Sequence, residues 1–360
     1  MLRMLRNSIL YFSLLLKNKS NIPSDSVYIE LLEVSTGAIR RLSHIYYLFR
    51  EAGYSCFVHI PFFNFIHRKY FFGITRDKGF VLVSKSFKKK NTLIVSDTPA
   101  AVSNKTVRIN YNIFTDKVDP VRDIFYPIGF HPDLMSKENE SFARSLSVKH
   151  ERKIAAFFAG NILERKYTNR RTKDYFNINT RYEIIAAIRD NLSSDYSYFP
   201  GSYEDLLEKM ESGYLRNKVV IMDTQKAGIP QHQWLRLLSE TDYFIYTPGI
   251  LYPWCHNQIE SMAAGAVPIT QFPHIFHPEL QDKENCFTWQ TTQNLVDILK
   301  EIATGKINAN HTSTLRMNIN AYYETNYSFE SFGKRIERFL NEADRDSVQL
   351  YICAGEHSMV

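Results

Sequence analysis

The chain has 360 residues, of which 44% are hydrophobic and 23% charged, and its formal net charge is +6. That length exceeds what a single hydrophobic core usually serves, and the composition excludes disordered and fibrous proteins, so we expect two globular domains. The basic residues are scattered rather than gathered in one stripe. This distribution disfavours nucleic acid as a partner and suits a nucleotide diphosphate or an anionic membrane surface.

The first 24 residues form a basic and apolar leader. Its apolar core, Ile9–Leu16, is far shorter than the ~20 residues that span a bilayer, and no small-residue cleavage site follows it. Two interpretations stay open: a helix lying on an anionic membrane surface, or an ordinary helix packed on the domain. The basic residues that flank the core are Arg3, Arg6, Lys17 and Lys19.

Residues 25–135 predict a first α/β domain. A strand at Val27–Leu32, a glycine loop, a helix from Ala38 to Gly53 and a strand at Cys56–Ile60 make a βαβ unit, which implies a parallel sheet. Further buried strands are expected at Phe80–Val83, Thr92–Val95 and Val107–Ile109.

A turn-rich segment, Asp123–Pro132, contains two prolines and a glycine and suits a linker between domains. A polar helix follows at Ser136–His150, and a second α/β domain is expected over 150–330, with a C-terminal helix and tail over 331–360. Its predicted strands are Ile154–Phe158, Lys218–Met222, Tyr243–Tyr246 and Val267–Thr270. Its predicted helices are Arg181–Asn191, Pro230–Ser239, Asn257–Ala264 and Leu295–Thr304, before a last helix at Phe329–Leu340.

The cysteines indicate a reducing environment. They are widely spaced, form no CxxC pair and match neither a disulfide framework nor a zinc module, so we expect reduced thiols in a cytoplasmic protein. They are Cys56, Cys255, Cys286 and Cys353.

The segment Tyr246–Thr270 carries the most informative pattern. A strand ends in the loop Thr247-Pro248-Gly249, and a helix follows that holds Asn257 and, three residues later, Glu260. A helix N-terminus has unpaired amides and the positive end of the dipole, so it favours pyrophosphate, and a carboxylate on the same face can accept both hydroxyls of a ribose. On spacing alone, a capping or surface glutamate is an equal alternative.

This segment resembles the donor-site signature of GT-B glycosyltransferases, as in the glycosyltransferase group 1 and exostosin-like families. The matching residues are Glu260-x-Met262-Ala263-x-Gly265 followed by Val267-Pro268-Ile269. In those families the glutamate binds the donor ribose, which implies that role for Glu260. The retaining family also keeps an acid eight positions earlier, where this chain has Tyr252, so the stereochemistry and the exact donor stay open.

Weaker similarities follow in the expected order along the chain. Ser35–Tyr54 resembles the first βα unit of GT-B enzymes, Pro127–Pro132 their linker, Phe157–Asn161 the opening of their second domain, and Leu237–Ile245 the step before the donor loop. The resemblance implies two Rossmann-like domains facing a central cleft, the first binding an acceptor and the second a nucleotide-sugar. It also implies that no metal and no further cofactor is needed.

Candidate site residues follow from the motifs and the resemblance together. For the departing diphosphate we expect Arg165, and Arg170 after it, because a cation stabilises charge that grows in the transition state. For acid–base work we consider Glu33, His59 and Asp97 at strand ends. The donor-binding set is Gly37, Gly160, Asn161, Arg170, Tyr246, Pro248, Gly249, His256, Asn257 and Glu260.

The function expected is transfer of a sugar from a nucleotide-sugar to a saccharide or glycolipid acceptor. Two alternatives share the fold: a sugar-nucleotide epimerase, and a sugar-binding scaffold without catalysis. Nucleotide hydrolases and dinucleotide enzymes are disfavoured, because the sequence has no GxxxxGK[ST] loop and no GxGxxG after the first strand. A zinc site at His274, His277 and Cys286 is disfavoured by its irregular spacing.

Overall fold

The computed structural model divides the chain into two compact units, one formed by 1–128 with 329–360 and the other by 129–328. The division falls within the turn-rich segment, and the C-terminal helix and tail, which the sequence sets apart, group with the first unit. The structure describes residues 2–16, 25–31, 39–67, 72–85, 87, 92–98, 105–113, 118–119, 121–147, 151–167, 171–250 and 252–353. The candidates Glu33, Gly37 and Arg170 lie outside the described residues.

The first unit is built on a parallel sheet of order β3-β2-β1-β4-β5-β13-β6. Its strands are β1 (Ser26–Glu30), β2 (Ser55–His59), β3 (Val81–Val83), β4 (Leu93–Ser96), β5 (Thr106–Asn110), β6 (Ile124–Phe125) and β13 (Ser347–Tyr351). Its helices are α1 (Leu2–Leu16), α2 (Ile39–Glu51), α3 (Phe62–His67), α4 (Phe72–Thr75) and α14 (Phe329–Asn341). The predicted βαβ unit is therefore confirmed as β1, α2 and β2.

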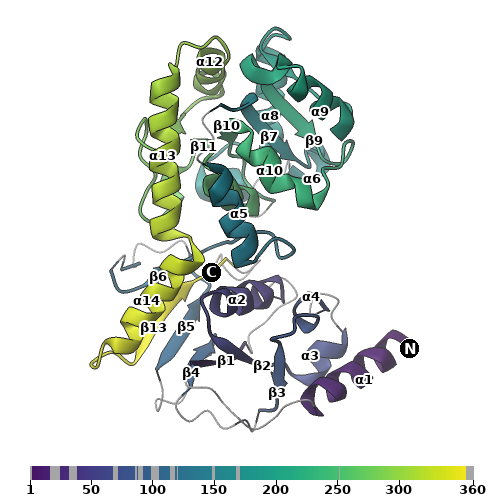
Figure 1. Cartoon of the computed structure of the whole chain (residues 1–360), viewed down its shortest axis with the longest axis vertical. Helices are drawn as coiled ribbons and strands as arrows, with labels where there is room; N and C mark the ends of the chain where they lie inside the picture. The colour runs from purple at the N-terminus through teal and green to yellow at the C-terminus, as the bar shows by residue number, and fades with distance from the viewer. Residues whose placement is uncertain are drawn as a thin grey trace. The chain divides into compact units, whose positions relative to one another are not determined.

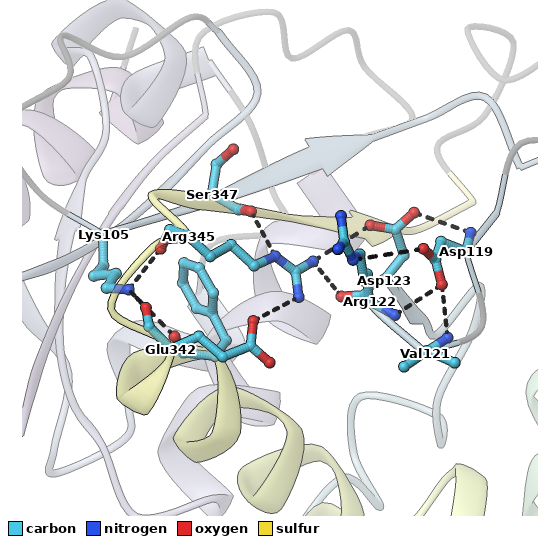
Figure 2. Close-up of polar contacts among 9 residues, drawn as sticks. Lys105, Asp119, Val121, Arg122, Asp123, Glu342, Arg345 and Ser347 are labelled. Atoms are coloured by element: carbon cyan, nitrogen blue, oxygen red, sulfur yellow. Dashed lines mark hydrogen bonds and ion pairs between the residues drawn. The ribbon is translucent and has the colours of Figure 1, made fainter.

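The last strand, β13, comes from the far end of the sequence and lies between β5 and β6. Figure 2 shows the polar contacts at its start: the Lys105 ammonium donates to the carbonyls of Glu342 and Arg345, and the Arg345 guanidinium donates to the Ser347 carbonyl at 3.1 Å. These bonds satisfy carbonyls of the turn that follows α14 and of the first residue of β13. They fix the turn that delivers β13 to its place between β5 and the edge strand β6.

The second unit carries a parallel sheet of order β12-β11-β10-β7-β9-β8. Its strands are β7 (Ile154–Gly160), β8 (Ser197–Tyr198), β9 (Val219–Asp223), β10 (Thr241–Ile245), β11 (Val267–Thr270) and β12 (Phe287–Thr288). Strands β7, β10 and β11 are almost entirely buried. Continuous burial is the pattern of parallel strands covered on both faces, so each unit is a Rossmann-like α/β layer structure, as predicted.

Helices of the second unit cover this sheet (Figure 1). The helices of this unit are α5 (Lys137–Ser147), α6 (Glu164–Tyr167), α7 (Arg171–Phe176), α8 (Arg181–Asn191), α9 (Tyr203–Glu211), α10 (Trp234–Ser239), α11 (His256–Ala263), α12 (Thr292–Ala303) and α13 (Ala309–Asn326). The eighteen-residue α13 was not predicted from the sequence. No helix in the described part of the chain is both long and apolar enough to cross a membrane.

Candidate functional site

The carboxyl edge of the second sheet is where ligands of parallel α/β folds bind, because loops and helix N-termini converge there. β7 ends there at Gly160, β9 at Asp223, β10 at Ile245 and β11 at Thr270. Three candidate donor-binding segments therefore come from one edge: the loop after β7, the loop after β10, and the start of α11.

Arg181 joins these three segments. Its guanidinium donates to the Asn161 carbonyl (3.2 Å), the Pro248 carbonyl (3.2 Å) and the Cys255 sulfur (3.2 Å). It also donates to the Tyr167 hydroxyl at 2.8 Å and lies 4.3 Å from the centre of the Tyr167 ring. Every partner is neutral, and among the described residues no carboxylate lies within 4 Å of it.

The charge of Arg181 is buried, and no charge of opposite sign pairs with it in the described part of the chain. The residue is 6% exposed and is the first residue of α8. Buried charges are normally paired with an opposite charge, and a cation in the first turn of a helix opposes the helix dipole. Thr180 and Glu183 form a capping box that holds this helix start in place against that cost. The arrangement leaves positive potential at the carboxyl edge of the sheet, which suits an anionic ligand.

Gln258 braces the loop between β10 and α11. Its amide nitrogen donates to the Pro253 carbonyl (2.9 Å) and the Thr247 carbonyl (3.4 Å), and its amide oxygen accepts from the Cys255 backbone N–H (3.1 Å). The side chain is fully buried. Cys255 is the N-cap of α11, so Gln258 holds the loop and the first turn of the helix as one body.

Two of the predicted glycines are positions of close approach. A Cβ at Gly249 would lie 3.0 Å from the Tyr252 carbonyl and 3.2 Å from the Trp254 carbonyl, so only glycine lets the loop fold onto itself. A Cβ at Gly160 would lie 2.9 Å from the Phe158 ring and 3.2 Å from the Arg181 guanidinium. Both glycines therefore permit the packing that surrounds Arg181.

Two buried polar atoms beside this loop have no hydrogen-bond partner among the described residues. They are the Thr247 hydroxyl, in the loop after β10, and the amide oxygen of Asn257, in the first turn of α11. Thr247 is 3% exposed and Asn257 is 8% exposed. Orphaned buried polar atoms are rare and point to an absent partner such as a ligand group or an ordered water.

Glu260 is fully buried and held by two donors. One carboxylate oxygen accepts from the His131 backbone N–H and the other from the Trp234 indole N–H, both at 2.6 Å. Burial raises the pKa of Glu260 to about 7, although the two hydrogen bonds lower it. In this arrangement the carboxylate holds together segments of the second unit. To contact a ribose, Glu260 must either lose one of these hydrogen bonds or accept a second hydrogen bond on one of its oxygens.

Other predicted residues are placed as follows. Tyr246 is fully buried, and its hydroxyl donates to the Gln258 carbonyl at 2.8 Å, so it supports the loop from the core. His256 is exposed at the start of α11, with its ring centre 5.1 Å from that of His131. Arg165 is exposed on α6, two residues before the Tyr167 ring that stacks on Arg181.

The acid–base candidates lie in the first unit. Asp97 directly follows β4 and accepts from the Tyr111 hydroxyl at 3.1 Å. His59 ends β2, is 8% exposed, and its ring nitrogen lies 3.1 Å from the Val83 carbonyl. Both are at the carboxyl edge of their sheet, as the sequence predicts, and their roles stay predictions.

Arg181, Gln258 and Trp234 contact the candidate site and were not predicted from the sequence. For Arg181 one signal was available, because the Thr180…Glu183 spacing of a capping box marks the next residue as the helix start. For Gln258 and Trp234 the contacts depend on loop geometry that periodicity does not encode.

Among the described residues, no cluster of three or more His, Cys, Asp or Glu side chains is arranged to hold a metal ion.

Comparison with known proteins gives structural likeness only. No protein-family model matches the chain, and no curated protein matches it in sequence. Solved structures that are similar include Anabaena HepE in complex with UDP and glucose (13% identity, 88% of this chain and 98% of that chain, TM-score 0.45). Others are a glycosyltransferase from Rickettsia africae (8%, 88% and 99%, TM-score 0.48) and WaaG, a glycosyltransferase involved in lipopolysaccharide biosynthesis (11%, 88% and 100%, TM-score 0.38). Identities and TM-scores this low carry no argument about function. The two parallel sheets are what identify the fold of this chain.

Proposed function

We propose that the chain is a GT-B glycosyltransferase that moves a sugar from a nucleotide-sugar donor to an acceptor. The observation that carries the proposal is the buried Arg181 guanidinium at the carboxyl edge of the second sheet, whose hydrogen-bond partners among the residues described are all neutral. A diphosphate is the part of a nucleotide-sugar that such a positive edge favours. The Glu260-x-Met262-Ala263-x-Gly265 resemblance, which the sequence shows in the same place, supports the same ligand.

Sugar transfer requires the protein to stabilise the leaving group, which is the nucleotide diphosphate. When the bond between the sugar and the diphosphate breaks, negative charge grows on the departing nucleotide, and fixed positive groups lower the barrier. The N-terminal turn of α11 and the field of Arg181 supply such groups, and we propose that the exposed side chain of Arg165 adds a further positive charge. In this scheme the reaction proceeds without a metal.

The two buried polar atoms without a described partner, on Thr247 and Asn257, suit the hydroxyl groups of the donor. An amide oxygen such as that of Asn257 accepts a hydrogen bond, and a threonine hydroxyl both donates and accepts. We propose that these two atoms bind ribose or sugar hydroxyls, and that Glu260 holds the α11 start in place or shares one oxygen with the ribose. The direct ribose role of Glu260 stays a prediction.

For the acceptor we propose a saccharide or glycolipid bound by the first unit, with Asp97 or Glu33 as the base. We also propose a cytoplasmic location. All four cysteines lie among the described residues and are free thiols, which fits a reducing compartment.

The test is a panel of nucleotide-sugars measured by thermal shift and then by turnover. A ligand that binds only the folded chain raises its melting temperature by mass action, so the true donor should stand out from nucleotides lacking the sugar. A transferase should release nucleotide slowly from this donor alone and faster when an acceptor is added.

The alternatives give different products in the same assay. An epimerase would change the sugar without releasing nucleotide, and a scaffold would bind a sugar without turning over any donor. If no nucleotide or nucleotide-sugar shifts the melting temperature at millimolar concentration, the donor site proposed here is wrong.

A further inference from the structure

The N-terminal helix α1 displays an apolar stripe. Leu5 is 60% exposed, Ile9 63%, Phe12 54% and Leu16 86%. At 3.6 residues per turn these four side chains fall within about 60° of arc, so they form one line along the helix. Phe63 of α3, 73% exposed, adds a fifth large apolar side chain on the helix against which α1 packs (Figure 1).

The opposite face of α1 fixes the helix to the first unit. The Asn7 amide donates to the Ile66 carbonyl at 2.9 Å, and the Tyr11 hydroxyl donates to the Ile60 carbonyl at 3.1 Å. The Tyr11 ring also meets the rings of Phe62 and Phe65 edge-on, with both centres at 5.2 Å. The helix is therefore attached by its buried face, and the stripe is directed away from the attachment.

The charged residues near the apolar stripe are basic, which favours an anionic partner surface. Residues 1–24 contain four basic residues and no acidic one, and α3 (FFNFIH) also lacks an acidic residue. Arg6 is exposed on α1, and the sequence continues past the helix with Lys17 and Lys19. An apolar helix face with basic flanks is the pattern of helices that lie in the interface of anionic bilayers.

We infer that the exposed face of α1, with Phe63, docks the protein on an anionic lipid surface. Leu5, Ile9, Phe12 and Leu16 enter the boundary between headgroups and acyl chains, and the exposed Arg6 contacts lipid phosphates. A second copy of this chain is the competing occupant, and it is disfavoured because pairing two such faces would bring two uniformly basic leaders together. This inference stands independently of the proposed transferase activity.

The test uses the full chain and vesicles of phosphatidylcholine with or without phosphatidylglycerol. We expect the protein to sediment with the mixed vesicles and to be released as salt is raised, because the electrostatic part of binding is screened. Ile9→Asp with Phe12→Asp should lower the partition coefficient at least about tenfold, since two charges would then have to enter the interface. Met317→Asp, which places the same charge at a 67% exposed apolar position on α13, is the matched control and should bind as the parent chain does.

A second variant reports insertion directly. Phe12→Trp should show a blue-shifted indole emission with mixed vesicles and quenching by brominated lipid, whereas Met317→Trp should show neither. Binding that is unchanged in the double Asp variant, or an indole emission that stays unshifted when the Phe12→Trp variant is bound to vesicles, overturns the inference. So does a dimer in light scattering that becomes a monomer in the double Asp variant while no form binds vesicles, which would assign the stripe to a second copy.

Discussion

Removing the unpartnered Thr247 hydroxyl should affect ligand binding without affecting stability. Because this atom has no partner among the described residues of the free chain, Thr247→Val should leave the free energy of unfolding unchanged or slightly raised. If the hydroxyl bonds the donor, the same change should weaken nucleotide-sugar binding about tenfold, the loss of one net hydrogen bond. Calorimetry and urea unfolding on the same preparation measure both quantities.

Thr312→Val is the matched control with the opposite expectation. The Thr312 hydroxyl lies 2.7 Å from the Tyr243 hydroxyl and is paired with it, so its removal should cost about 1 kcal/mol of stability. Nucleotide-sugar affinity should not change. Equal affinity in Thr247→Val and the parent chain would remove Thr247 from the donor site.

Glu260 should make stability depend on pH. Its pKa is about 7 in the folded chain, against 4.5 for an ordinary glutamate. Below pH 4.5 both states hold the proton. As the pH rises from 4.5 to 7 the unfolded state ionises first, so this group's contribution to the free energy of unfolding is lost, by about 3 kcal/mol in all.

Glu260→Gln removes this titration. The difference in unfolding free energy between the parent chain and the variant should therefore change by about 2 kcal/mol between pH 5 and pH 7.5, with the parent chain losing stability. Urea unfolding at the two pH values measures it. A difference that stays constant would mean that the two donors, His131 N–H and Trp234 N–H, keep the carboxylate ionised throughout.

At the level of single residues, the sequence predicted which segments meet but not how they meet. Gly160, Asn161, Pro248 and Gly249 do surround one point of the structure, as their positions after parallel strands require. The residue at that point, Arg181, was missed because it lies 20 residues from Asn161 and 67 from Pro248. Contacts of that range follow from packing of the chain and carry no local periodic signal.

Among the elements, those with a strong local pattern were predicted and those without one were not. The helix Arg181–Asn191 and the strand Val267–Thr270 have the predicted bounds. Helix α13 was missed because residues of weak helix propensity fill it, including four asparagines. It is stabilised by burial of side chains such as Leu315, Ile319 and Tyr323.

Gly265 ends α11 and should tolerate no side chain. Its φ is +71°, a region costly for other residues, and a Cβ would lie 3.0 Å from both the Arg152 guanidinium and the Ser147 Cβ. That guanidinium caps the helix by donating to the Ala264 carbonyl at 2.9 Å. Gly265→Ala should therefore lower the free energy of unfolding by about 1–3 kcal/mol, read from urea unfolding.

Gly228→Ala is the control for that substitution in the same unit. No atom lies within 4 Å of a Cβ built there, and its φ is not in the left-handed region, so stability should be unchanged or slightly higher. Equal midpoints for the two variants would show that the end of α11 adapts, and that its approach to β11 does not depend on glycine.

For the whole molecule, the chain path makes the two units unequal. The second unit is one continuous segment, 129–328, whereas the first needs both ends of the chain. Strand β13 supplies this dependence: its residues pair with β5 from Thr106 to Asn110 and with β6 at Ile124 and Phe125. Helix α14 adds a core contact, with the Phe332 ring centre 5.0 Å from that of Phe49.

A fragment of residues 129–328 should therefore fold alone and show a cooperative urea transition. It should also bind the nucleotide-sugar, because Arg181, Thr247 and Asn257 all lie within it. Residues 1–128 alone should not fold cooperatively, because without β13 the strand β5 becomes an open edge and β6 has no neighbour. Joining 329–360 to 1–128 through a flexible linker should restore a cooperative transition, since loop closure costs little as linkers lengthen. A cooperative transition in 1–128 by itself would show that the five strands β1 to β5 and their helices suffice, and that β13 is an addition to a sheet already stable.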